Sequence, residues 1–100
     1  MTDAQPPRQA IRTLQARKRI ALIAHDGKKS EMLEWATRWQ GVLSQHELIG
    51  TGTTAGRLKS TLGLSVEGLM SGPLGGDQQI GARIAEQRLD VLIFFWDPFS

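Results

Sequence analysis

Short, continuous apolar runs are the feature that most limits what this chain can fold into. The segment 20–24 is one such run, and the segment 90–96 contains the longest, with six apolar residues ending at Trp96. A run without polar alternation is typical of a strand that is buried on both faces of a parallel sheet. We expect the second run, which is the more apolar, to be the central strand.

A helical pattern follows the first of these runs. One stripe of apolar side chains at helical period comprises Met32, Trp35, Ala36, Trp39, Val42 and Leu43. The stripe predicts a single helix with both tryptophans in the core, and Ser30 or Asp26 is placed to cap its start.

Two more strands and two more helices complete the pattern. They are strands at 46–49 and 64–70, a helix that carries Leu58 and Leu62 with Gly63 as its C-cap, and a helix at 78–87. In the last helix, the residues expected to face inward are Ile80, Ile84 and Ala85. Gly81 is expected to allow the helix to pack closely on the sheet. The order β-α-β-α-β-α-β predicts an α/β fold with a parallel sheet and right-handed crossovers.

Polar clusters follow each of the four expected strands. They are His25-Asp26, the loop 51–54, the stretch 71–77 and Asp97. Because the carboxyl ends of parallel strands meet at one edge of the sheet, where ligands bind in such folds, we expect the four clusters to form one site.

Two of these clusters have the composition of an anion site. Thr51, Thr53 and Thr54 lie among glycines before a helix, where free amides and the helix dipole attract an anion. The glycine spacing fits neither a dinucleotide fingerprint nor a P-loop, so the pattern favours a single phosphate. Asp77 stands at the start of the last helix, either beside a bound anion or as an ordinary N-cap. Lys29, with Lys28, is either a solvated pair or an anion ligand.

Composition narrows the class of protein further. The chain has no cysteine, which excludes disulfides, thiolate metal sites and cysteine nucleophiles. A formal net charge of +2 suits a small anion but is too low to indicate nucleic acid. No apolar run is long enough to span a membrane, and no signal peptide is visible, so a cytoplasmic protein is expected.

Polarity also divides the chain. Residues 1–17 are predicted to be a loose N-terminal arm, residues 18–100 the folded domain, and the basic run 17–19 a solvated flank of the first strand.

Several blocks of the sequence are similar to those of the methylglyoxal synthase family, from about Arg12 to the last residue. These blocks are Ala24-His25-Asp26, Lys29, Gly50-Thr51-Gly52-Thr53-Thr54, Ser71-Gly72-Pro73, Gly75-Gly76-Asp77-Gln78-Gln79 and Phe94-Phe95-Trp96-Asp97-Pro98. The resemblance implies a three-layer, flavodoxin-like α/β fold with helices on both faces of the sheet.

The resemblance also implies an activity. The family converts dihydroxyacetone phosphate into methylglyoxal and inorganic phosphate without a metal or organic cofactor. Asp77 would be the base, His25 would help to bind the substrate and Asp97 would line the site. The phosphate would be held by Lys29, Thr51, Gly52, Thr53, Thr54, Ser71 and Gly72. Inhibition by free phosphate and a bacterial homohexamer are further implications.

The chain departs from the family pattern in two places. The family domain is longer, and its segment after Asp-Pro brings a further strand, a helix, and a second histidine and aspartate of the site. We therefore expect a domain that is incomplete at its C-terminus, and an isolated chain that folds poorly or self-associates through apolar surface. The second departure, Gly27-Lys28, is expected to have no consequence.

Two rival functions stay open. The same fold serves as a regulatory domain that binds a phosphate ligand without catalysis, and such a module needs the phosphate cradle but no base at Asp77. A relic without activity, acting only as a subunit in mixed oligomers, would bind phosphate and form no product.

Overall fold

The computed structural model describes residues 17–99, so most of the predicted arm lies outside the described residues. The predicted alternation of strands and helices is confirmed. The elements are β1 Arg19–Ala24, the 3₁₀ turn η1 Asp26–Lys28, α2 Lys29–Arg38, α3 Gln40–Leu43, β2 Glu47–Thr51, α4 Thr53–Leu62, β3 Val66–Leu69, the 3₁₀ turn η2 Gly72–Leu74, α5 Gly76–Ala85 and β4 Val91–Phe95.

The four strands form one parallel sheet in the order β3-β2-β1-β4. Ala21 of β1 lies opposite Ile49 of β2 on one side and Leu92 of β4 on the other. Among the described strands, β1 and β2 are therefore interior and β4 lies at an edge, so the prediction that the last strand is central is wrong for the described residues. An apolar sequence indicates that the faces of a strand are packed against other elements. It does not indicate whether the strand is hydrogen-bonded to a neighbouring strand at one edge or at both.

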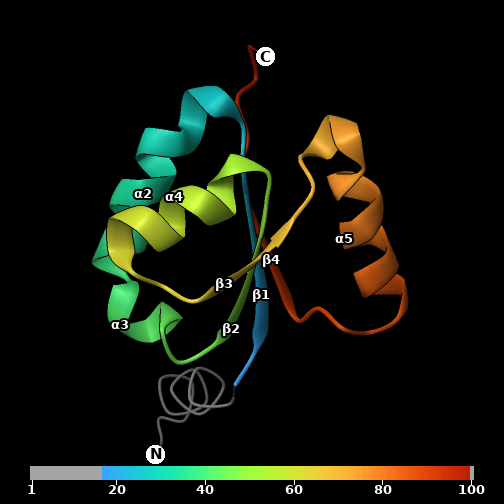
Figure 1. The fold of residues 1–100 in the computed structure, drawn as a ribbon, viewed down its shortest axis with the longest axis horizontal. Coiled ribbons are helices and arrows are strands. Elements are labelled where there is room, and N and C mark those ends of the chain that lie inside the picture. Colours follow the sequence, from blue (N-terminus) through green and yellow to red (C-terminus); the bar gives the residue numbers. More distant parts are fainter. Residues whose placement is uncertain (1–16, 100) are drawn as a thin grey trace, which may run out of the picture.

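Helices cover both faces of the sheet, as the three-layer prediction requires. Figure 1 shows α2, α3 and α4 on one face and α5 on the other. The chain moves from β1 outward to β3 and then returns past β1 to β4. Right-handed crossovers in opposite directions place their helices on opposite faces. The reversal also creates a switch point between β1 and β4, where ligand clefts form in such sheets.

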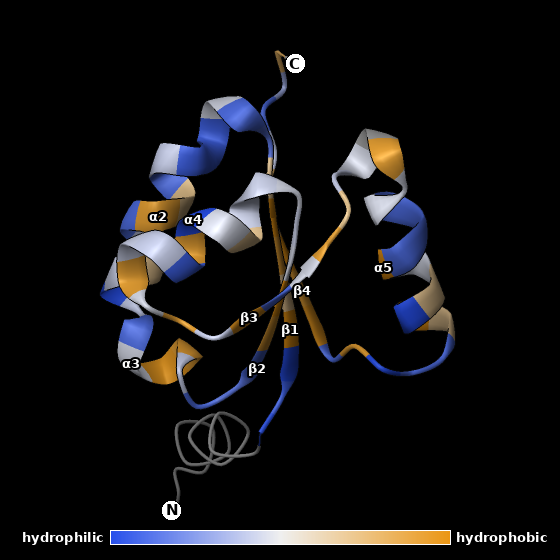
Figure 2. Cartoon of the chain, in the orientation of Figure 1, coloured by the Kyte–Doolittle hydropathy of each residue, from blue (hydrophilic) through white to orange (hydrophobic). Residues whose placement is uncertain are grey.

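The core has two unequal parts, which we call the three-helix face and the α5 face. The strands between them are the apolar centre of the molecule (Figure 2). Buried residues on the three-helix face are Ile20, Leu22, Ala24, Met32, Ala36, Leu43, Leu48, Ala55, Leu58, Leu64 and Val66. On the α5 face they are Ala21, Ile49 and Ile80.

The predicted first helix is interrupted. It ends at Arg38, and a short second helix starts at Gln40 after Trp39, whose backbone leaves the helical region. Trp35 packs edge-on against Phe95 at 5.6 Å, as an inward-facing tryptophan should. Trp39 is 46% exposed, so its prediction as a core residue is wrong, because the break turns it out of the stripe.

The helix ends also differ in part from expectation. Neither Ser30 nor Asp26 caps α2, whose N-cap is Lys28 and has no side-chain cap hydrogen bond. The turn η1 leads directly into the helix instead. The C-cap of α4 is confirmed, because Gly63 adopts the left-handed conformation that ends helices.

The prediction for α5 holds for one of its three apolar residues. Ile80 is buried, whereas Ile84 is 52% exposed and Ala85 is exposed. Gly81 is also exposed, and a Cβ placed there would meet nothing within 4 Å, so it does not serve close packing. Among residues 17–99, α5 is the one helix on its face of the sheet, and its later turns are exposed.

Candidate functional site

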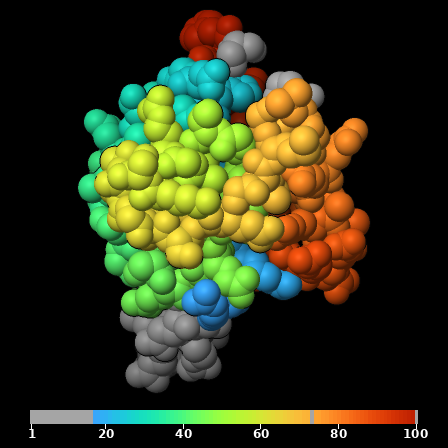
Figure 3. Space-filling model, in the orientation of Figure 1, coloured from blue at the N-terminus to red at the C-terminus, as the bar shows by residue number. Residues whose placement is uncertain are grey.

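A cleft of about 900 Å³ lies at the carboxyl end of the sheet. It is lined by eight of the ten site residues predicted from the sequence, namely His25, Lys29, Thr51, Gly52, Thr53, Ser71, Gly72 and Asp77. Figure 3 shows the segments after β1, β2 and β3, in cyan, green and light orange, converging at one end of the molecule. Three of the four expected polar clusters therefore line one cleft. Thr54 and Asp97 are not among the lining residues.

The loop after β2 packs directly on the loop after β3. Gly52 has a φ of 53°, a conformation that favours glycine, and a Cβ placed on it would come 3.0 Å from the Cβ of Ser71. The Gly52 N–H also donates to the carbonyl of Leu69 over 3.1 Å. Together these contacts bring Thr53, the first residue of α4, and Ser71 to the same wall of the cleft. Hydroxyls and helix-start amides at one place can bind an anion.

Thr54 lies behind this wall. It is fully buried, and its Oγ1 is the single buried side-chain polar atom without a hydrogen-bond partner among the described residues. Leaving a buried hydroxyl unpaired costs about 1–3 kcal/mol, which the fold tolerates next to the cleft. Its predicted contact with phosphate stays a prediction.

Asp77 is held at the start of α5 by tight glycine turns. The N-cap is Gly75, and Asp77 is the second residue of the helix, so the N-cap interpretation of Asp77 is wrong. A Cβ on Gly76 would lie 2.0 Å from the carbonyl oxygen of Met70, which shows how closely the turn folds back on β3. A Cβ on Gly72 would lie 3.1 Å from Asp77 Oδ1, so the carboxylate rests against the Gly72 main chain.

One residue that supports this turn was not identified from the sequence. The side-chain oxygen of Gln79 accepts a hydrogen bond from the main-chain N–H of Met70 over 2.8 Å. The bond ties the first turn of α5 to the end of β3. The Gly-Gly-Asp-Gln-Gln block contained this residue, but no rule of spacing predicts such a contact.

Lys29 is not part of a solvated pair. Its side chain is buried, and its ammonium donates to the carbonyl oxygen of Ala24 and pairs with Asp26 at 3.5 Å. Lys28 instead pairs with Glu31 at 2.9 Å on the surface, which raises the pKa of Lys28 through that hydrogen bond. The two neighbouring lysines therefore have different roles, and only Lys29 lines the cleft.

His25 connects the ends of β1 and β4. Its Nδ1 accepts the main-chain N–H of Asp97 over 2.9 Å, and its ring packs edge-to-face on Phe94 with centroids 5.1 Å apart. The Asp97 carboxylate lies close to Gly27, where an added Cβ would come 2.6 Å from Oδ2. Phe94 also lines the cleft, with Leu92 and Ile80. These three apolar residues were assigned to the core by sequence, which does not distinguish a cleft wall from a core.

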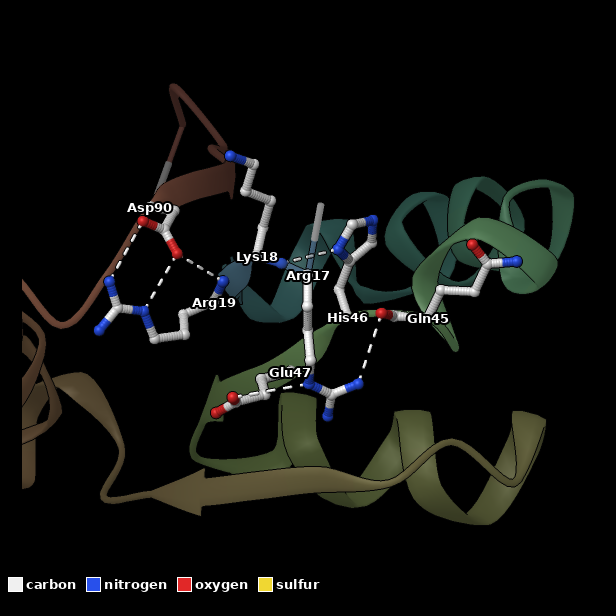
Figure 4. A network of polar contacts seen from close by, with 7 residues as sticks. All are labelled: Arg17, Lys18, Arg19, Gln45, His46, Glu47 and Asp90. Atoms are coloured by element: carbon white, nitrogen blue, oxygen red, sulfur yellow. Dashed lines mark hydrogen bonds and ion pairs between the residues drawn. The ribbon is translucent and has the colours of Figure 1, made fainter. Parts of the chain in front are cut away.

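The opposite end of the sheet has a separate polar network (Figure 4). Arg19 donates to Asp90 through both its side chain and its main chain, and these hydrogen bonds lower the pKa of Asp90 to about 2. Lys18 donates its main-chain N–H to Nδ1 of the buried His46 over 2.9 Å. The basic run 17–19 therefore stays at least partly exposed to solvent, as predicted, and also joins the strand starts, because Arg19 pairs with Asp90.

Neither a metal centre nor a membrane segment is found within residues 17–99. No group of three or more histidine or carboxylate side chains there is arranged to hold a metal ion. No helix in that range is both long enough and apolar enough to cross a bilayer. The donors that face the cleft are hydroxyls, amides and one ammonium, which suit a phosphate oxygen.

Comparisons with known proteins agree with this geometry. Residues 31–100 match the family model of the MGS-like domain. The methylglyoxal synthase of Yersinia enterocolitica serotype O:8 / biotype 1B is 52% identical over 89 residues, or 89% of this chain and 59% of the relative. That of Saccharophagus degradans is 58% identical over 87 residues, or 87% of this chain and 56% of the relative.

A solved structure is similar as well. The crystal structure of methylglyoxal synthase from Elizabethkingia anophelis NUHP1 superimposes with a TM-score of 0.80 at 52% identity, covering 82% of this chain and 54% of that one. The chain spans less than 60% of the length of each of these three relatives.

Proposed function

The chain belongs to the MGS-like domain family, and from this premise we propose that its cleft binds dihydroxyacetone phosphate and takes part in its conversion to methylglyoxal and inorganic phosphate. One observation supports the proposal above the others. The Asp77 carboxylate rests against Gly72, directly beside the wall made by Thr53 and Ser71. A base and an anion cradle therefore share one cleft.

The phosphate group binds to the wall of the cleft. Thr53 and Ser71 offer hydroxyls, the first turn of α4 offers main-chain amides, and Thr51 closes the end of β2. Lys29 supplies the positive charge from a buried position that it already shares with Asp26. Thr54 completes the set if its unpaired hydroxyl turns toward the ligand. Charge-assisted hydrogen bonds of this kind are stronger than neutral ones.

Asp77 removes the proton that starts the reaction. It takes a proton from the hydroxymethyl carbon beside the ketone, and the electron pair left behind forms an enediolate. Hydrogen-bond donors near the carbonyl oxygen lower the energy of that anion. The enediolate electrons then break the bond between carbon and the phosphate ester oxygen. Phosphate leaves into the cradle that already holds it and takes up the hydroxyl proton of the enediolate. The enolate left behind gains the proton that Asp77 removed, now at its methylene carbon, and becomes methylglyoxal.

The test is turnover of dihydroxyacetone phosphate by the wild-type chain and by Asp77→Asn. The amide is not a base, so we expect methylglyoxal formation to fall by about 10²–10⁴-fold. Phosphate binding, measured by calorimetry, should persist in the same variant. Asp90→Asn is the matched control, because it removes a carboxylate at the opposite end of the sheet. Full turnover in Asp77→Asn would contradict the assigned role.

The same assay separates the rival function. If both this chain and a form extended to the family length bind phosphate but form no product, the cleft acts as a phosphate-binding module, whose cradle does not need Asp77. Product inhibition is expected in the catalytic case, since inorganic phosphate competes for the donors that hold the substrate. The homohexamer implied by the resemblance and the cytoplasmic location expected from the sequence stay predictions.

A further inference from the structure

Both histidines of the chain accept a main-chain N–H at Nδ1. For His25 the donor is Asp97, and for His46 the donor is Lys18, each at 2.9 Å. A ring nitrogen that accepts an N–H presents its lone pair, so it cannot hold a proton of its own. The proton of the neutral ring therefore sits on Nε2 in both residues. The two sites lie at opposite ends of the sheet, and only His25 lines the cleft.

The ring of His25 is fixed in orientation as well as in tautomer. Phe94 packs edge-to-face against it with an interplanar angle of 87°, which fits the preferred geometry of ring pairs. The main-chain bond from Asp97 fixes the other side of the ring. A ring that is held in this way can donate a hydrogen bond only through Nε2.

The side chain of Asp97 has contacts of its own. Its Oδ1 accepts the N–H of Phe99 over 2.9 Å, and its Oδ2 lies where a side chain at position 27 would otherwise be. Gly27 thus makes room for the carboxylate while the main chain of Asp97 faces the imidazole. The group that sets the tautomer is the N–H, which every residue except proline would supply.

We propose that Asp97 is a positioning residue, whose main-chain N–H holds His25 as an Nε2–H donor to an oxygen of the bound phosphate ester. The proposal rests on the function proposed above, which it deepens by assigning His25 one proton and one direction of donation. A neutral donor polarises a substrate oxygen without transferring a proton to it. His25 then assists binding and charge stabilisation, and the base remains Asp77.

The test is ¹⁵N NMR of the histidine rings in the 100-residue chain, which reports directly which nitrogen carries the proton. We expect the Nε2–H pattern for both rings. Inorganic phosphate, added as the probe, should shift the His25 Nε2 signal and leave His46 unchanged. His46 serves as an internal reference, because the same type of bond holds it away from the cleft.

Three variants separate the main chain from the carboxylate. Asp97→Ala and Gly27→Ala keep the N–H of residue 97 and remove or displace the carboxylate, so the His25 tautomer should be retained. Asp97→Pro deletes the donor, so His25 should become a mixture of tautomers while His46 keeps its pattern. Phosphate binding in Asp97→Pro should weaken about tenfold more than in Asp97→Ala, the effect of one poorly directed hydrogen bond to a charged group.

The outcomes are distinct. An Nδ1–H pattern for His25 in the wild-type chain would overturn the proposal without any variant, as would a tautomer change in Gly27→Ala. A phosphate-dependent shift at other cleft residues, with the His25 signal unmoved, would overturn the donor role alone. Absence of any phosphate effect in the chain would instead contradict the proposed function. An unchanged His46 signal shows that the Asp97→Pro chain is folded.

Discussion

The two faces of the sheet differ in how many side chains they bury. Among the described residues, the three-helix face buries eleven side chains, from Ile20 to Val66, whereas the α5 face buries three. On the first face, Leu22, Met32 and Leu58 are fully buried. On the second, Leu92 and Phe94 remain 44% and 49% exposed. The α5 face is the thinner layer, and its exposed apolar residues also line the cleft.

Most of the packing that stabilises the fold is therefore on the three-helix face, whereas the proposed base is on the α5 face. Thr53 of the proposed phosphate site is anchored on the three-helix face, since it begins α4, which packs through Ala55 and Leu58. The proposed base, Asp77, stands on α5, which is attached through Ile80 and the turn before it. The proposed phosphate site and the proposed base can therefore be perturbed separately.

The largest expected effect is the loss of packing on the three-helix face. Leu58→Ala removes a side chain that is fully buried, and the resulting cavity should lower the free energy of unfolding by about 3 kcal/mol. Urea denaturation followed by circular dichroism measures this change. A loss below about 1 kcal/mol would mean that this face collapses around the cavity and is not the firmer of the two.

A smaller loss is expected on the α5 face. Ile80→Ala truncates the one buried apolar side chain of α5 and should lower the free energy of unfolding by about 2 kcal/mol, because fewer neighbours surround the gap. The matched control is Ile84→Ala on the same helix, which should change stability by less than about 0.5 kcal/mol since Ile84 is half-exposed. Equal losses in the two variants would show that α5 packs differently in solution.

The smallest effect concerns the ion pair that joins the starts of β1 and β4. The hydrogen bonds from Arg19 hold the pKa of Asp90 at about 2, below the ordinary 3.8. A carboxylate with a lowered pKa in the fold stabilises it above pH 3.8, and this contribution disappears as the pH falls toward 2. The difference in free energy of unfolding between the wild type and Asp90→Asn should therefore disappear as the pH falls from 3.8 to about 2.

Acid titrations of both proteins measure that difference. The pair is partly exposed, so added salt should reduce the difference as well. A difference that persists unchanged below pH 2 would show that Asp90 acts through packing and not through its charge.

The sequence predicted the element order because apolar runs and helical stripes report burial directly. It could not predict the position of β4 in the sheet. The same apolar run is compatible with a central strand and with an edge strand whose side chains stay partly exposed. Trp39 and Ile84 continue their stripes in the sequence, but a break in one helix and the lack of a neighbour for the other leave them exposed. Patterns of this kind describe a helix and not what lies beside it.

For the candidate site, residue types, strand ends and the family resemblance together predicted ten residues, eight of which line one cleft. The remaining features depend on the main chain, which carries no sequence signal. The N–H of Asp97 that meets His25 and the carbonyl of Ala24 that accepts Lys29 are present in every residue type. Only three-dimensional proximity reveals them. The expected self-association of the chain stays a prediction.

The turn before α5 has a consequence for how this protein can vary. Position 76 has no space for even one carbon atom beyond the main chain, because the carbonyl of Met70 occupies it. In a saturation library selected for a folded, phosphate-binding chain, glycine should be the single survivor at this position. Position 81, five residues along the same helix, faces open space and should accept most side chains. Tolerance to substitution along α5 would thus rise steeply within two turns of Asp77, the proposed base.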